Sequence, residues 1–219
     1  MKKIIILIVI NLICLPIYVF ASELTDEIII TKCPLTPQVW ELRSFPESNS
    51  TNNLRRKQGS PEFAAGDFIT VEGKIVDSNC VPVEGAIVEI WQANALGINQ
   101  YETHDYKKID SNFLESGSTL TDNLGYYSFL TILPGATEVH APHINFRITH
   151  EDFIPMETTM FFENQSLNHK DPTLINEIDA TQRHLLVAKG EKINKNSLEE
   201  GVNYHFDITL EGKNKYLTY

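Results

Sequence analysis

Basic side chains are scarce in this chain of 219 residues. Lys and Arg number 18 against 29 Asp and Glu, so the formal net charge at pH 7 is −11. Such a surplus of negative charge is repelled by nucleic-acid phosphates and by anionic lipid headgroups. We therefore expect neither a nucleic-acid partner nor binding to an anionic membrane surface.

Long apolar runs are missing as well, except at the N-terminus. Residues 4–20 are almost wholly apolar, follow two lysines, and end in Val19-Phe-Ala21, which provides small residues for a signal peptidase. This pattern predicts a secretory signal peptide over residues 1–21 and a secreted or periplasmic protein. Pro16 interrupts the run and so favours cleavage after Ala21 over the alternative of an uncleaved membrane anchor. Cleavage leaves 16 basic residues against 29 acidic ones, a net charge of −13 with no anchor.

Cysteine is rare. Of three cysteines, Cys14 lies within the expected signal peptide and follows bulky Ile13, which argues against a lipid-attachment site. The other two, Cys33 and Cys80, would meet an oxidising compartment, where an even pair predicts a disulfide. Such a bridge would pin the N-terminal part of the mature chain to the first hairpin. The alternative is two free thiols.

No long amphipathic helical pattern occurs anywhere in the mature chain. Prolines and a polar run break residues 22–66 into an irregular N-terminal arm, whose basic cluster at residues 55–57 is typical of a solvated loop. Residues 67–219 instead contain short alternating segments separated by turn residues and by irregular stretches at 93–119 and 168–180. We expect one all-β domain, a β-sandwich. Its predicted strands cover residues 68–76, 83–91, 126–132, 143–149, 158–162, 182–189 and 204–210.

Two histidines three residues apart, His140 and His143, introduce the most informative of these strands. Alternate side chains of a strand share a face, so His143, Asn145 and Arg147 form a polar row. The opposite row is apolar (Ile144, Phe146, Ile148). A polar row of this kind suits a strand that lines a metal-binding cavity, and it equally suits histidines that are only hydrogen-bonded within a strand.

Several motifs follow one another in a fixed order. They are Cys33-Pro-Leu-Thr-Pro37, Gly85-Ala-Ile-Val-Glu-Ile-Trp-Gln-Ala-Asn-Ala-Leu-Gly97, Asp110-Ser-Asn-Phe113, Thr121-Asp-Asn-Leu-Gly-Tyr-Tyr-Ser-Phe129 and His143-Ile-Asn-Phe146. Together they resemble the intradiol ring-cleavage dioxygenases, the family of protocatechuate 3,4-dioxygenase and catechol 1,2-dioxygenase. The resemblance implies a prealbumin-like sandwich of two mainly antiparallel sheets. It also implies an O2-dependent, iron-dependent opening of a catechol ring between its hydroxyl groups.

The resemblance further implies where a metal would lie. In the family, Fe(III) is held by two tyrosines and two histidines, since phenolates stabilise the ferric state. The matching positions in this chain are Asn99, Thr137, His143 and Asn145, so only His143 keeps the ligand type of the family. The family's arginine before the first histidine corresponds to His140.

Three further residues are candidate ligands. Tyr101 would reach the site if the loop after Gly97 had shifted, and His104 and His140 would join His143 in a histidine-rich site for Fe(II), Zn(II) or Cu(II). The alternative for Tyr101 and His104 is that they are loop side chains without a metal. Two functions therefore remain open: a dioxygenase acting on a small catechol-like aromatic, and a catalytically inactive secreted sandwich that binds an aromatic ligand, a metal or a partner protein. The sequence leaves a homo-oligomer open.

Overall fold

Short strands and three helical turns account for the regular structure of residues 32–39, 48–99, 108–193 and 200–212, which the computed structural model describes. All of these residues belong to one compact unit, Thr31–Tyr219. The strands are β1 (Phe68–Asp77), β2 (Ile87–Trp91), β3 (Ser116–Leu120), β4 (Tyr126–Ile132), β5 (His143–Thr149), β6 (Met156–Phe162), β7 (Val187–Lys192), β8 (Val202–His205) and β9 (Ile208–Leu210). The turns are η2 (Asn168–Lys170), η3 (Thr173–Glu177) and η4 (Arg183–Leu186).

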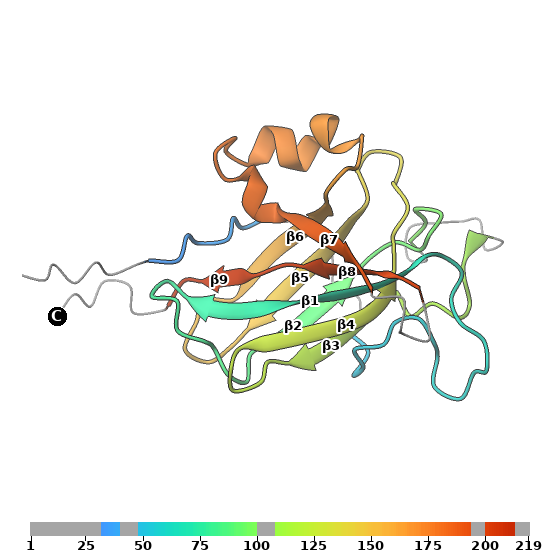
Figure 1. Ribbon diagram of the computed structural model, residues 1–219, viewed down its shortest axis with the longest axis horizontal. Coiled ribbons are helices and arrows are strands. Elements are labelled where there is room, and N and C mark those ends of the chain that lie inside the picture. The colour runs from blue at the N-terminus through green and yellow to red at the C-terminus, as the bar shows by residue number, and fades with distance from the viewer. Residues whose placement is uncertain (1–31, 40–47, 100–107, 194–199, 213–219) are drawn as a thin grey trace, which may run out of the picture. The chain divides into compact units, whose positions relative to one another are not determined.

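The named strands form one continuous hydrogen-bonded path in the order β3-β2-β5-β6-β7-β8-β1-β4, with β9 added beside β1. Strand β7 joins the two halves: its first residues pair with β6 and its later residues pair with β8 (Figure 1). The expected all-β class is confirmed. Because one path connects all the strands, the division into two separate sheets stays a prediction.

The core is built by the apolar rows of the strands. The row that the sequence assigns to the inner face of β5 is almost completely buried. Phe146 of β5 lies with its ring centroid 6.0 Å from that of Tyr127 on β4 and 5.2 Å from that of Phe206. Burial of large aromatic side chains contributes strongly to the stability of such a core. The packing also fixes the register of β5, and thereby the direction of its polar row.

Part of the N-terminal arm adds to the sheet. The main chain of Thr51 accepts a hydrogen bond from Ser118 of β3 (2.9 Å), and Leu54 donates one to Leu130 of β4 (2.8 Å). The Leu54 side chain is fully buried. This segment therefore bridges β3 and β4, covering backbone groups that an edge strand would otherwise expose.

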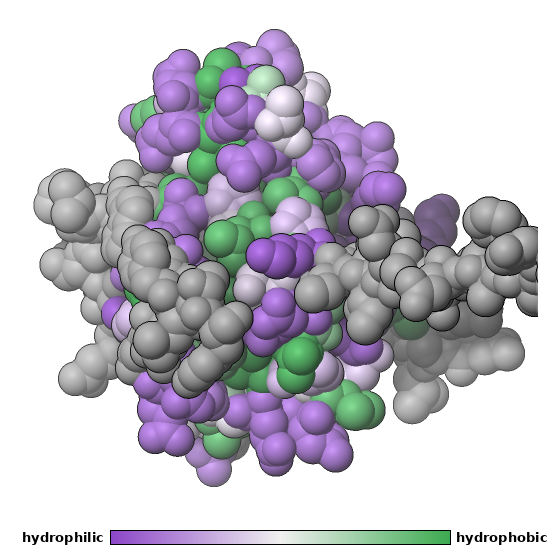
Figure 2. Space-filling model, turned by 90° about the vertical axis from the view of Figure 1, so that its left-hand side faces the viewer, coloured by the Kyte–Doolittle hydropathy of each residue, from purple (hydrophilic) through white to green (hydrophobic). Residues whose placement is uncertain are grey.

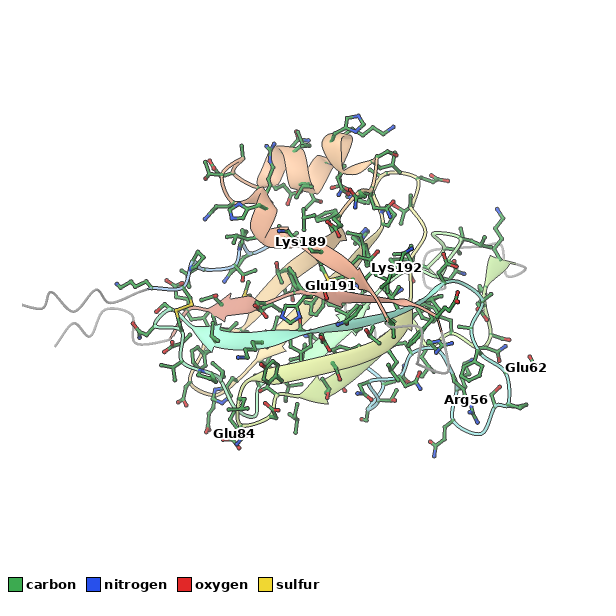
Figure 3. All side chains as sticks on the ribbon, in the orientation of Figure 1. Arg56, Glu62, Glu84, Lys189, Glu191 and Lys192 are labelled. Carbon is green, nitrogen blue, oxygen red and sulfur yellow. A yellow bond between two sulfur atoms is a disulfide. The ribbon has the colours of Figure 1, made fainter. Side chains whose placement is uncertain are left out.

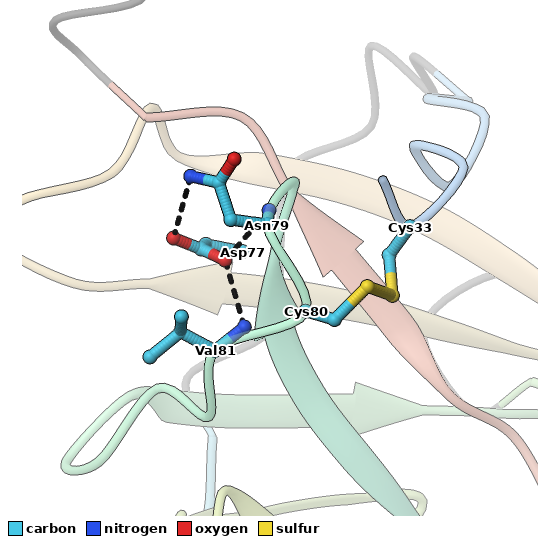
Figure 4. Close-up of a disulfide and its surroundings, with 5 residues drawn as sticks. All are labelled: Cys33, Asp77, Asn79, Cys80 and Val81. Atoms are coloured by element: carbon cyan, nitrogen blue, oxygen red, sulfur yellow. Dashed lines mark hydrogen bonds between the residues drawn. A yellow bond between two sulfur atoms is a disulfide. The ribbon is translucent and has the colours of Figure 1, made fainter. Parts of the chain in front are cut away.

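A disulfide fixes the beginning of the described arm. Cys33 and Cys80 are joined with their Cα atoms 5.3 Å apart, and the Cys33 N–H donates to the carbonyl of Ser78 (Figure 4). The Asp77 carboxylate accepts hydrogen bonds from the N–H groups of Asn79 (2.8 Å) and Val81 (2.9 Å), which shapes the turn that carries Cys80. The bridge thus attaches the arm to the turn after β1.

Several predicted boundaries are wrong. The strand expected at 83–91 begins only at Ile87, because Gly85 has a φ of 75° and interrupts the extended backbone. The irregular stretch 93–119 contains most of β3, whose pairing with β2 was missed because Ser, Gly and Thr form a weak strand pattern. The strand expected at 182–189 is instead η4 followed by β7. The strand expected at 204–210 is divided into β8 and β9.

The surface carries charges of both signs. Lys189, Glu191 and Lys192 lie along β7, whereas Arg56 and Glu62 lie on the opposite side of the described unit from Glu84 (Figure 3). In the face drawn in Figure 2, hydrophilic side chains surround small apolar groups. None of the helical segments in the described part of the chain has the length and apolarity needed to span a bilayer.

Candidate functional site

The two loops that carry Asn99 and Thr137 are in direct backbone contact. The resemblance matches these two residues to the family's tyrosine ligands. The carbonyl of Asn94 accepts hydrogen bonds from Gly97 and Gly135, each 2.9 Å long. Gly97 has a φ of 74°, and a Cβ atom at this residue would lie 1.9 Å from the carbonyl oxygen of Ala136. Only glycine fits such an approach. Because Asn99 and Thr137 each follow one of these glycines by two residues, the contact holds their loops together.

Thr137 is used by the protein itself. Its hydroxyl accepts a hydrogen bond from the N–H of His140 (3.0 Å), and its own N–H donates to the carbonyl of His140 (3.0 Å). Threonine and serine commonly stabilise tight turns in this way. The position that corresponds to a tyrosine ligand thus shapes the turn that leads to β5.

His143 is the first residue of β5, in agreement with the strand predicted from the sequence. Its Nδ1 atom lies 2.7 Å from the carbonyl oxygen of Ala141. A carbonyl can only accept a hydrogen bond, so this contact requires a proton on Nδ1. The ring lies between His140 and Phe161, with centroid distances of 5.5 and 6.0 Å. Metal-binding histidines are commonly oriented by a carbonyl in this way.

Asn145, two residues further along the same face of β5, is buried at 6% exposure. The hydroxyl of Thr159 on β6 donates to its Oδ1 atom at 2.8 Å, and the two residues are register partners across the strands. The amide oxygen at the second histidine position therefore already accepts a proton from the protein. An amide oxygen is also a weak ligand for a transition metal.

His140 is paired with Asp171, a residue that sequence reasoning does not single out. His140 Nδ1 lies 3.4 Å from Asp171 Oδ2, and the Asp171 side chain is inaccessible to solvent. Burial by itself would raise the pKa of Asp171. Hydrogen bonds from His140, Ala141 and Leu174 outweigh this effect and lower the pKa below its ordinary value. The available sequence signal was an Asp-Pro pair before a helical turn, which is typical of a helix start.

The structure thus brings His140 and His143 together and places Thr137 in the turn before them. Tyr101 and His104, the other two candidate ligands, lie outside the described residues. No group of three or more His, Cys, Asp or Glu side chains that could hold a metal ion occurs within the described ranges.

The donor atoms at the four matched positions do not fit the ferric ion that the resemblance implies. They comprise one imidazole, two carboxamides and one hydroxyl, and none of them is an anionic oxygen. Two of the oxygens, on Thr137 and Asn145, already accept hydrogen bonds from the protein. Fe(III) is stabilised by hard anionic ligands, so these four residues by themselves supply too little negative charge.

Comparisons with known proteins agree with the motifs. A family model described as Dioxygenase matches residues 45–212. The chain is 34% identical to the protocatechuate 3,4-dioxygenase beta chain of Burkholderia cepacia, over 72% of this chain and 68% of that protein. It is 27% identical to the protocatechuate 3,4-dioxygenase alpha chain of Pseudomonas putida, over 68% of this chain and 74% of that protein.

Among solved structures, the fold resembles that of 3-chlorocatechol 1,2-dioxygenase from Rhodococcus opacus 1CP. The TM-score is 0.64 at 18% identity, and the match covers 83% of this chain and 73% of that one. The family model covers well over half of the chain, and it agrees with the motif order and with the shared fold. The chain therefore belongs to the intradiol ring-cleavage dioxygenase family.

Proposed function

We propose that this chain is a divergent intradiol dioxygenase that opens a catechol-type aromatic ring with O2. The observation that carries the proposal is His143, which keeps the family's ligand type at the family's position on β5. Its Nδ1–H donates to the carbonyl of Ala141 at 2.7 Å, which orients the ring. The relatives named protocatechuate 3,4-dioxygenase support the substrate class.

The proposal assigns the remaining metal ligands to residues other than the three substituted ones. Tyr101, His104 and His140 are the candidates, of which Tyr101 is the only phenol. A site of this composition has fewer anionic oxygens than the family's ferric site and is expected to accept Fe(II) more readily than Fe(III). The proposed cofactor is therefore iron. The family resemblance implies Fe(III), which this set of ligands favours less than Fe(II).

The test uses the purified mature chain, loaded with Fe(II) or Fe(III) under controlled oxygen. Bound iron is measured by mass spectrometry, and O2 consumption is followed with catechol and with protocatechuate. The expected product is the substrate mass plus two oxygen atoms. His143→Ala should abolish iron binding, whereas His205→Ala, at an exposed position on β8, should leave it unchanged. A wild-type protein that takes up no iron and consumes no O2 would refute the proposal.

A second candidate is a catalytically inactive β-sandwich that binds an aromatic ligand, a metal or a partner protein. The observation in its favour is that Thr137 and Asn145 are engaged in protein hydrogen bonds where the family has metal ligands. Calorimetry with catechol separates the two: binding without iron and without O2 consumption favours this candidate. A visible charge-transfer band that appears only in the Asn99→Tyr/Thr137→Tyr/Asn145→His variant would also favour it.

We also propose that the protein is exported by cleavage after Ala21. We further propose that the half of the path that contains β5 and the half that contains β1 and β4 pack against each other as the two sheets of a sandwich. The two lysines and the apolar run of residues 1–21 support the first point, and the edge-to-face contact of Phe146 on β5 with Tyr127 on β4 supports the second. N-terminal sequencing of the exported protein should begin at Ser22. A protein retained in the cell with Met1 in place would contradict export. Size-exclusion chromatography with light scattering will determine whether the chain forms homo-oligomers.

A further inference from the structure

The helical segment that follows β6 contacts the histidine-bearing turn through one buried carboxylate. Asp171, between η2 and η3 of this segment, is 1% exposed. A buried carboxylate is costly unless hydrogen bonds compensate for lost hydration. Its Oδ2 atom accepts from the N–H of Ala141 at 2.8 Å, and its Oδ1 atom accepts from the N–H of Leu174 at 3.1 Å. Each oxygen thus holds a different part of the chain.

We propose that Asp171 is a positioning residue that fixes the tautomer and ring orientation of His143 through the main chain of Ala141. The contacts form an unbroken series. Asp171 Oδ2 binds the N–H of Ala141, and the carbonyl of Ala141 binds Nδ1–H of His143 at 2.7 Å. Ala141 is 1% exposed, so water is not available to replace either bond.

The backbone between Ala141 and His143 has little conformational freedom. Pro142 separates Ala141 from His143, and a proline fixes its own φ and keeps the preceding residue in an extended conformation. Ala141 therefore has little freedom to redirect its carbonyl once its N–H is held. The ring of His143 inherits this restriction, because its Nδ1–H must follow the carbonyl.

The other side of the carboxylate rests on a well-anchored element. Besides the Oδ1 contact, the carbonyl of Asp171 accepts a hydrogen bond from the N–H of Ile175 at 2.9 Å. The guanidinium of Arg183 donates to the carbonyls of Ile175 (2.8 Å) and Ile178 (3.1 Å), which ties η3 to η4. Asp171 thus connects the turn before β5 to a braced helical segment. A residue that only capped η3 would have no need of the Ala141 contact.

The test compares Asp171→Ala with the control Asp179→Ala. Asp179 lies in the same segment and also accepts a hydrogen bond from a nearby N–H, that of Thr181, but it is exposed. Both changes remove one negative charge. An alanine at position 171 has no acceptor oxygen, so the N–H groups of Ala141 and Leu174 both lose their partner. Circular dichroism verifies that both variants are folded.

The readout is the tautomer of His143, measured in the full chain with ¹⁵N-labelled histidine at a pH where the ring is neutral. His143→Gln assigns the signal. The wild type and Asp179→Ala are expected to show the Nδ1–H form, and Asp171→Ala is expected to lose it in favour of the Nε2–H form. An unchanged Nδ1–H signal in folded Asp171→Ala would overturn the proposal.

Should Asp171→Ala fail to fold, the wild type still decides the question. The Ala141 amide proton is expected to be shifted downfield and protected from hydrogen exchange, and an unprotected amide would overturn the proposal. The importance of His143 rests on the function proposed above, but neither measurement requires a metal or turnover. A protein that lacks dioxygenase activity and yet shows these signals would refute the proposed function alone.

Discussion

Replacing Gly97 by alanine should destabilise the protein and separate the two loops that carry Asn99 and Thr137. The backbone at Gly97 has a φ of 74°, a left-handed conformation that costs an L-residue about 1–2 kcal/mol. The added Cβ would lie 1.9 Å from the carbonyl oxygen of Ala136, so one loop has to move by roughly 1 Å or more. Overpacking of this kind costs about 1–3 kcal/mol. Loss of the Gly135–Asn94 hydrogen bond adds about 1 kcal/mol.

Gly85→Ala is a matched control. Gly85 has nearly the same φ, 75°, but nothing lies within 4 Å of the Cβ that would be added there. Gly85→Ala should lower the free energy of unfolding only by the conformational cost of about 1–2 kcal/mol, whereas Gly97→Ala should lower it by about 3–6 kcal/mol. Urea unfolding followed by tryptophan fluorescence measures both free energies of unfolding. Equal losses in the two variants would show that the loops can separate at no cost and would refute the reasoning.

Three further predictions concern the disulfide, the buried phenol of Tyr127 and the hydrogen bond between Thr159 and Asn145. Cys33→Ser/Cys80→Ser should lower the free energy of unfolding by about 4 kcal/mol, since the bridge spans 47 residues of chain; urea unfolding with and without reductant measures it, and identical midpoints would contradict it. Tyr127→Phe should cost about 1 kcal/mol at pH 7, because it removes a buried hydrogen bond to a main-chain carbonyl. Burial raises the pKa of Tyr127 well above 10.0, so the phenol ionises first in the unfolded chain. The extra free energy of unfolding of the wild type over the variant is therefore complete below pH 10 and declines as the pH rises toward the folded pKa. An extra stability of the wild type that grew in alkali would contradict this reasoning. Thr159→Val should cost about 1–3 kcal/mol by leaving the buried Asn145 oxygen without its donor, and thermal unfolding that matches the wild type would rule out this role.

The sequence predicted the strand pattern best where an apolar row faces the core. The alternation in residues 143–149 fixed β5 and its buried face, and the motif order pointed to the family that the comparisons support. Prediction failed at β3, where Ser, Gly and Thr depend on pairing with β2 and with the arm. It also failed at residues 183–186, where a helical turn precedes β7. Local patterns are weak at such places because tertiary contacts decide the conformation.

Residue identity alone determined that Asn99, Thr137 and Asn145 stand at the positions where the resemblance predicts two tyrosines and a second histidine. No packing arrangement can change which donor atoms those side chains carry. The tertiary structure decided what the substituted residues do instead. It placed Thr159 against Asn145, Thr137 against the backbone of His140, and the buried Asp171 against Ala141. These contacts join residues from separate strands and loops, and a hydrogen bond between them depends on the folded register rather than on any local sequence signal.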